Sequence, residues 1–189
     1  MPGLSRPPTP EPPLPDGFVA VFDSGVGGLT ILRELQTALP NTPLLYYADS
    51  AHMPYGPQPA EVIHGWVESA VHRLIERGAR VVVLACHSAS ATSLHRLRET
   101  FPDTPFVGLE PAVKPAAEAT RTGVIGVLPT QTTASSALYQ RVVARYASHL
   151  LVITRPAPEL VLLVEREPLD GFAAHDAVSR ALAPINEAG

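Results

Sequence analysis

Short apolar runs alternate with longer amphipathic stretches along most of the chain, and this rhythm restricts the fold more than any other feature of the sequence. Apolar runs at residues 18–22, 44–48 and 80–85 have the length of buried strands. Hydrophobic residues at helical spacing fill residues 29–39 and 62–75 between them. Strands that alternate with helices are joined by right-handed crossovers, so the pattern predicts an α/β fold with a mostly parallel sheet.

The same rhythm starts again after Pro111, once a helix ending near residue 101 and a short strand at 106–107 complete the first set. In the second set we expect strands at 123–128 and 150–153, a hydroxyl-rich loop at 130–136, and helices at 139–146, 157–166 and 171–187. The chain ends after a helix, where the rhythm calls for another strand. We therefore expect a first α/β domain at residues 17–111 and an incomplete second one at residues 112–189.

Composition excludes several classes of partner. The formal net charge of −4 gives no basic field for nucleic acid or an anionic membrane surface. The single cysteine excludes an internal disulfide framework and fits a reducing cytoplasm. No apolar stretch approaches the length of a membrane span, and the N-terminus lacks the pattern of a secretory signal. Seven prolines within residues 1–16 instead predict a disordered, proline-rich tail.

Cys86 follows the strand at residues 80–85 and precedes small and polar residues that predict a turn and then a helix. A thiol in that position lies at the positive end of the helix dipole, near free backbone N–H groups, and both favour the thiolate form. Such a thiolate could take a proton from carbon as a general base without a cofactor. The alternative is a small buried hydrophobic residue, since free cysteine is often fully buried.

Three loops follow strands at the same edge of the expected sheet, where ligands bind in folds of this class. The turn at residues 23–28 is glycine-rich but matches neither the dinucleotide fingerprint nor the Walker motif, which argues against nucleotides. The acidic Asp23 suits a ligand that carries an amine, or a thiol that needs a base. The other two loops cover residues 49–57 and 86–89. Together the loops should bring to one site Asp23, Ser24, Tyr55, Gly56, Cys86, His87 and Ser88.

Other kinds of site find little support. No spacing between the seven histidines and Cys86 matches a pattern of metal ligands, so we expect no metal. The nucleophile elbow of serine hydrolases is absent from the sequence. His52, in the second loop, is expected to be a surface residue rather than a ligand or a base. We expect no cofactor.

Four stretches in the same order resemble the motifs of glutamate racemases, which belong to the aspartate/glutamate racemase family. The opening motif is similar to residues 21–30, with the letters Asp-Ser-Gly-Val-Gly-Gly at its centre. The second motif resembles residues 47–56, and the first cysteine motif resembles residues 85–91. A hydroxyl-rich loop of the family is similar to residues 127–139. The resemblance extends over residues 18–189 and covers about three-quarters of a family member.

The resemblance implies two similar parallel-sheet α/β domains that face each other across a cleft. It implies cofactor-independent interconversion of L- and D-glutamate in the cytoplasm, which supplies D-glutamate for peptidoglycan and so for cell-wall biogenesis and cell shape. Two cysteines act on opposite faces of the substrate carbon, and Cys86 corresponds to the first. The family's substrate contacts correspond to Asp23, Ser24, Tyr55, Gly56, His87, Ser88 and Thr133. Glutamate is the implied small-molecule partner, and a homodimer is a further expectation.

Two departures from the family pattern affect the expected activity. His87 and Ser88 stand where the family usually has asparagine and threonine. Serine keeps a hydroxyl for a carboxylate, whereas histidine is bulkier and can carry charge at about pH 6–7. The family's second cysteine, in a Gly-Cys-Thr-His motif, is not among the 189 residues and is expected shortly after them. One thiol cannot remove a proton from one face and return it to the other, so we expect racemisation by this chain to be absent or very weak.

Two alternatives stay open. His87 in place of asparagine leaves room for a racemase that acts on another acidic amino acid, such as aspartate. A single thiol also fits a degenerate protein that binds a ligand or a partner without catalysis. Comparison of L-aspartate with L-glutamate as substrates would separate the first alternative from the glutamate enzyme.

Overall fold

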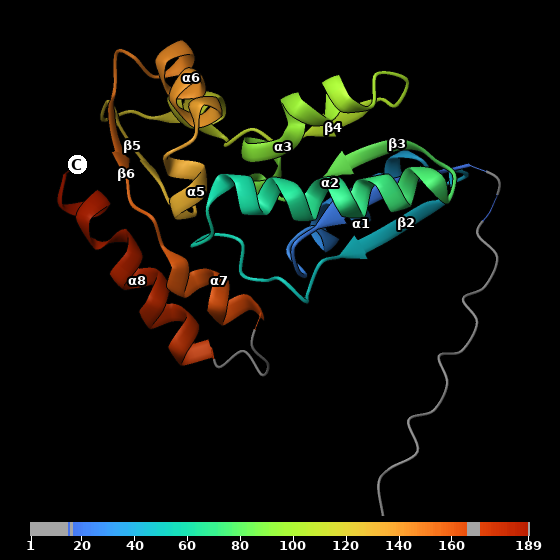
Figure 1. Ribbon diagram of the computed structural model, residues 1–189. Coiled ribbons are helices and arrows are strands. Elements are labelled where there is room, and N and C mark those ends of the chain that lie inside the picture. Colours follow the sequence, from blue (N-terminus) through green and yellow to red (C-terminus); the bar gives the residue numbers. More distant parts are fainter. Residues whose placement is uncertain (1–14, 16, 166–170, 189) are drawn as a thin grey trace, which may run out of the picture.

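The computed structural model describes residues 15, 17–165 and 171–188, and two parallel β-sheets with flanking helices form its frame (Figure 1). The first sheet has the strand order β2-β1-β3-β4. These strands are β1 Phe18–Asp23, β2 Leu44–Ala48, β3 Ala79–Leu84 and β4 Phe106–Gly108. The expected α/β fold with parallel pairing is confirmed. The proline-rich tail expected at residues 1–16 lies, except for Pro15, outside the described residues.

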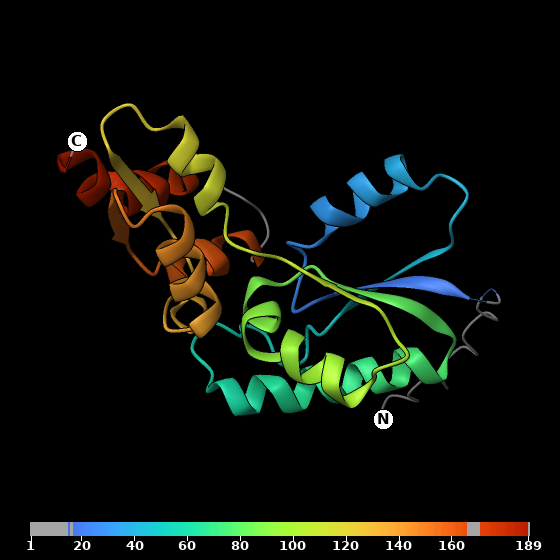
Figure 2. The same cartoon turned by 90° about the horizontal axis from the view of Figure 1, so that it is seen from above.

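Three helices sandwich the first sheet. They are α1 Leu29–Ala38, α2 Ala60–Glu76 and α3 His87–Thr100. Helix α1 covers one face of the sheet, and α2 and α3 cover the other (Figure 2). Side chains alternate between these faces along β1, because Phe22 joins the core under α2 and α3 whereas Val21 packs toward α1. A strand buried on both faces is apolar throughout, which explains the unbroken apolar run that marked it in the sequence.

The second sheet consists of β5 Val124–Val127 and β6 Leu151–Thr154, which also pair in parallel. Its helices are α4 Val113–Ala119, α5 Gln131–Ala134, α6 Ala137–Tyr146, α7 Pro158–Glu165 and α8 Gly171–Glu187. A second core joins Ile125 of β5 to Val113 of α4 and Tyr139 of α6. Within the described residues, no helix is both long enough and apolar enough to cross a membrane.

Two short helices of the second half differ from the sequence-based expectations. Residues 130–136 were expected to form a loop, but they contain α5, which Thr130 starts as its N-cap by accepting the N–H of Thr133. Helix α4 was not expected, because its seven residues, three of them alanine, show no amphipathic period. Pro115 falls in the first turn of α4, where the missing N–H of proline breaks no helical hydrogen bond.

His64 on α2 predicts a pH-dependent contribution to stability. Its side chain is buried, and Nδ1 has no hydrogen-bond partner in the described structure. Burial lowers the pKa of His64, with a smaller lowering from Arg96 and opposing contributions from Glu68 and Glu61. The unfolded chain therefore binds a proton at a higher pH than the folded protein does. The free energy of unfolding should fall as the pH drops through about 6.5, the ordinary value for histidine.

Urea unfolding of wild-type protein and of His64→Leu at about pH 7 and about pH 5 measures this contribution. The wild-type protein should lose more stability between the two pH values than His64→Leu does. His72, an exposed histidine on the same helix, provides the matched control as His72→Gln, which should keep the wild-type loss. An equal loss in all three proteins would contradict the prediction.

Candidate active site

A cavity of about 400 Å³ opens beyond the carboxyl ends of β1 and β3, the sheet edge indicated by the sequence. All seven residues that were expected to converge there line its wall: Asp23, Ser24, Tyr55, Gly56, Cys86, His87 and Ser88. Thr133, the eighth residue singled out by the resemblance, lies behind the wall. The second half of the chain closes the cavity through Thr130 and helix α7.

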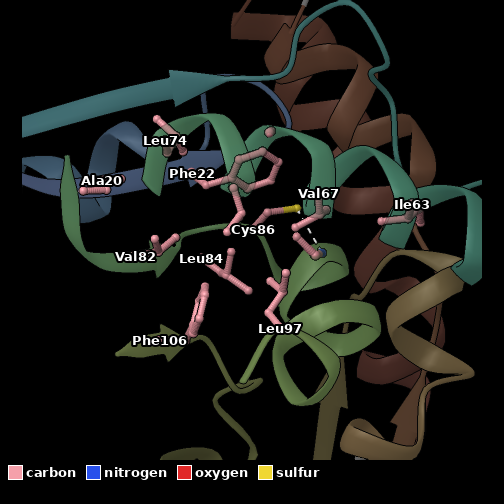
Figure 3. Packing of buried hydrophobic residues seen from close by; sticks show 14 of the residues in the cluster. Ala20, Phe22, Ile63, Val67, Leu74, Val82, Leu84, Cys86, Leu97 and Phe106 are labelled. Carbon is pink, nitrogen blue, oxygen red and sulfur yellow. Dashed lines mark hydrogen bonds between the residues drawn. The ribbon is translucent and has the colours of Figure 1, made fainter. Parts of the chain in front are cut away.

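Cys86 is the N-cap residue of α3, so the local sequence prediction of a strand followed by a helix places its thiol at a helix N-terminus. Its sulfur accepts a hydrogen bond from the backbone N–H of Ala89 at 3.5 Å and lies 3.5 Å from the hydroxyl of Ser24. The residue also joins the main core beside Phe22, Val67 and other apolar side chains (Figure 3). Cys86 is thus a nearly buried thiol that still borders a cavity.

The expected shift of the Cys86 thiol toward thiolate is wrong. Burial raises the pKa of the thiol, and the negative charge of Asp23 raises it further. The hydrogen bonds from Ala89 and Ser24 act in the opposite direction but are the smaller influence. Desolvation outweighs the helix N-terminus here because the sulfur is almost completely enclosed. A reactive thiolate therefore needs a change in its surroundings, such as a bound cation.

The Asp23 carboxylate is held by the fold itself. Its Oδ2 accepts the backbone N–H of Gly28 at 2.8 Å and the hydroxyl of Tyr46 at 3.2 Å. Gly28 fits because a Cβ at that position would lie 2.8 Å from Cβ of Ala85 and 2.9 Å from Cβ of Asp23. The glycine-rich turn thus allows α1 to begin directly against the end of β1, with the N–H of Gly28 bonded to the carboxylate.

A chain of hydroxyl groups crosses from the first half of the protein to the second. The Ser88 hydroxyl lies 2.9 Å from that of Thr130, which donates to the Thr133 hydroxyl at 3.0 Å. Thr130 lines the cavity, whereas Thr133 is buried behind it. Sequence reasoning named Thr133 and missed Thr130. Its position before α5, where a threonine N-caps the helix, is the signal that could have identified it.

The loop at residues 49–59 presents Tyr55 to the cavity through a buried polar contact. The Tyr55 hydroxyl donates to Oδ2 of Asp49 at 2.6 Å, and Nδ1 of His52 lies 2.9 Å from both oxygens of the same carboxylate. The His52 ring stacks on Trp66 with 4.4 Å between ring centroids. His52 does not line the cavity and acts as a structural partner of Asp49, at a partly exposed position.

Thr132 fastens this loop to the second half of the chain. Its hydroxyl donates to the carbonyl of Gly56 at 2.8 Å and reaches that of Gln58 at 3.1 Å. Its backbone N–H also donates to the Gly56 carbonyl at 3.3 Å. Because Gly56 borders the cavity, these bonds fix one wall of the cavity relative to α5. No pattern in the sequence indicates this contact, which joins residues 76 positions apart.

His87 stands at the cavity with part of its ring exposed. Partial desolvation lowers the pKa of His87, and a hydrogen bond with the backbone of Glu110 and the charge of Asp23 oppose this effect only in part. This direction runs against the expectation that His87 carries charge at about pH 6–7, because burial disfavours the charged form of the ring.

Helix α7 supplies the remaining wall, which the sequence analysis did not include. Its apolar side chains Leu160, Val161 and Val164 line the cavity, and Glu165 at its end accepts the backbone N–H of Val26 at 3.1 Å. Among the described residues that line the cavity there are two carboxylates, those of Asp23 and Glu165, and no lysine or arginine. The site therefore offers carboxylates for an ammonium group and hydroxyl and N–H groups for a carboxylate, which together suit an amino acid.

Comparisons with known proteins agree with this chemistry. A family profile described as Asp/Glu/Hydantoin racemase matches residues 29–184. The glutamate racemase of Pseudomonas aeruginosa is 48% identical over 171 residues, which are 90% of this chain and 64% of that protein. The glutamate racemase of Herpetosiphon aurantiacus is 42% identical over 92% of this chain and 68% of its own length. The chain thus spans about 64% of the length of the Pseudomonas relative it matches.

Solved structures give the same result. The Escherichia coli glutamate racemase, crystallised with L-glutamate and the activator UDP-MurNAc-Ala, superposes with a TM-score of 0.80 and is 36% identical. The match covers 90% of this chain and 64% of that one. The Thermus thermophilus glutamate racemase, in complex with β-chloro-D-alanine, has a TM-score of 0.72 at 35% identity and covers 90% and 63% of the two chains.

Proposed function

We propose a function for this chain from its family, because the chain belongs to the Asp/Glu/hydantoin racemase family. In this proposal the chain takes part in the interconversion of L- and D-glutamate and provides the first of two proton-transferring thiols. The single observation that carries this proposal is Cys86 at the N-terminus of α3, bordering a cavity that suits an amino acid. The product D-glutamate is a building block of peptidoglycan, so the proposed role lies in cell-wall biogenesis.

Substrate binding follows from the groups around the cavity. Ser24, Ser88 and Thr130 offer hydroxyls to the substrate carboxylates, and Thr133 supports Thr130 from behind. Asp23 and Glu165 offer carboxylates to the α-ammonium group. Tyr55, Gly56 and His87 shape the remaining wall. We propose these roles for the predicted site residues.

The reaction needs a thiolate beside the substrate carbon. Cys86 removes the α-proton as a general base, and the electron pair left on carbon is delocalised into the α-carboxylate. Binding of the ammonium next to Asp23 offsets the negative charge that raises the pKa of the thiol. The substrate itself thereby favours formation of the thiolate. Return of a proton to the opposite face requires a second acid, and Cys86 is the only cysteine among the 189 residues.

Three further expectations remain proposals. We propose that residues 17–111 and 112–189 form separate α/β units, which the two sheets and their separate core clusters support. We propose a cytoplasmic location, which the single free cysteine supports. The homodimer expected from the family resemblance also stays a prediction.

An aspartate racemase is the second candidate, favoured by the bulk of the His87 ring at the cavity wall. Protection of Cys86 against iodoacetamide distinguishes the two substrates. D- or L-glutamate should slow alkylation of the 189-residue chain by about tenfold at saturation, because the bound amino acid covers the sulfur. Glutarate, which is glutamate without its ammonium group, provides the control and should protect little. Better protection by aspartate would favour the second candidate, and no protection by either amino acid would contradict both.

A further inference from the structure

Tyr46 lies under the glycine-rich turn and outside the cavity in which the proposed reaction takes place. It lies on β2, paired in register with Val21 of β1, and its ring packs in the small core on the α1 side of the sheet. Its hydroxyl lies 2.8 Å from the carbonyl of Gly25 and 3.2 Å from Oδ2 of Asp23, and both oxygens are acceptors for its proton. One phenol group thus ties the turn and the carboxylate to the neighbouring strand.

These bonds give the Asp23 carboxylate a fixed orientation. Oδ2 faces into the fold, where it accepts from the N–H of Gly28 and from the Tyr46 hydroxyl. No hydrogen bond within the described part of the chain uses the other oxygen, Oδ1, although Asp23 borders the cavity. Oδ1 is therefore the oxygen that remains for a ligand group or for the environment of Cys86.

We propose that Tyr46 is a positioning residue, whose hydroxyl holds the Asp23 carboxylate beside Cys86 with one oxygen turned into the fold and the other left for the substrate. This inference rests on the proposed function, because that function assigns Asp23 and Cys86 their roles. The tyrosine touches neither the cavity nor the substrate and acts only through Asp23.

The electrostatic coupling of these groups agrees with the geometry. Burial raises the pKa of Tyr46, and Asp23 raises it further through its charge and the hydrogen bond. The phenol therefore stays protonated and remains a donor throughout the range in which thiols titrate. The titratable groups that face Cys86 from the surrounding elements are Asp23, Tyr55, His87 and Glu165, with Tyr46 behind the first.

The pH dependence of Cys86 alkylation by iodoacetamide tests the inference without requiring racemase activity. Tyr46→Phe removes the O–H dipole that compensates the Asp23 charge, so the midpoint for thiolate formation should rise by about half a pH unit. In the Asp23→Asn background, whose own midpoint should fall, Tyr46→Phe should cause no further shift. The dissociation constant for D-glutamate should also increase about tenfold in Tyr46→Phe, since the ammonium loses an oriented partner.

Tyr47→Phe is the matched control, because Tyr47 is the next residue of β2 and its hydroxyl accepts from Arg73 on the other face. It should leave both the midpoint and the affinity unchanged. An unchanged midpoint in Tyr46→Phe, or an equal shift in the Asp23→Asn background, would overturn the inference. Lack of D-glutamate binding by wild-type protein would contradict the proposed function but leave the alkylation result decisive for Tyr46.

Discussion

Cys86→Ser should lower the rate at which the 189-residue chain exchanges the α-proton of glutamate with solvent by about 10²–10⁴-fold. Cys86 provides the only thiol among the 189 residues. A serine hydroxyl in its place is far too weakly acidic to ionise, so it does not form an anion that could act as the base. Loss of the α-proton signal of glutamate in D₂O, followed by proton NMR, measures the exchange. The variant changes one atom at a nearly buried position, so its far-ultraviolet circular dichroism should match that of the wild type.

The stereochemistry of the exchange provides the internal control. A single thiol returns the proton to the face from which it took it, so one enantiomer of glutamate should exchange and keep its configuration. The other enantiomer should remain unlabelled, and no racemate should accumulate. Racemisation at ordinary enzyme rates would show that the two-thiol argument does not apply to this chain. Equal exchange by wild type and Cys86→Ser would remove Cys86 from the mechanism.

The sequence predicted the location of the site because that location depends on local pattern. Apolar runs fix where strands end, and parallel strands bring their carboxyl ends to one edge, so Asp23 and Cys86 had to lie at the same edge of the sheet. The loop that carries Tyr55 also follows a strand, β2, and reaches the same edge. Seven of the candidate residues accordingly share one cavity.

The sequence pattern did not predict the contacts between segments that are distant in the chain. Thr130 lines the cavity and Thr133 lies behind it because of the way α5 packs against α3. The hydrophobic periodicity of the sequence does not predict this packing. Glu165 approaches the turn at residues 23–28 from 139 positions away, so α7 could be expected as a helix but not as a cavity wall. The direction of the Cys86 pKa shift was also missed, because it depends on the number of apolar groups around the sulfur.

Gly28→Ala should destabilise the protein by about 1–3 kcal/mol and also weaken ligand binding. The backbone of Gly28 is in the ordinary right-handed helical region, so the added methyl group costs nothing through its torsion angles. The cost comes from space, because the new Cβ would lie under 3.0 Å from the Cβ atoms of Ala85 and Asp23. Both atoms belong to the strand ends that carry the site, so relief of the clash displaces Asp23, the residue before Cys86, or both.

Gly65→Ala gives the opposite result for the same chemical change. Gly65 lies within α2, and a Cβ built there meets nothing within 4 Å. Alanine should therefore stabilise the protein by about 0.5–1 kcal/mol through helix propensity alone. Urea unfolding measures both variants, and Cys86 protection by D-glutamate should weaken only in Gly28→Ala. If Gly28→Ala were as stable as wild type and bound D-glutamate equally well, the close packing of the turn would not be what positions Asp23.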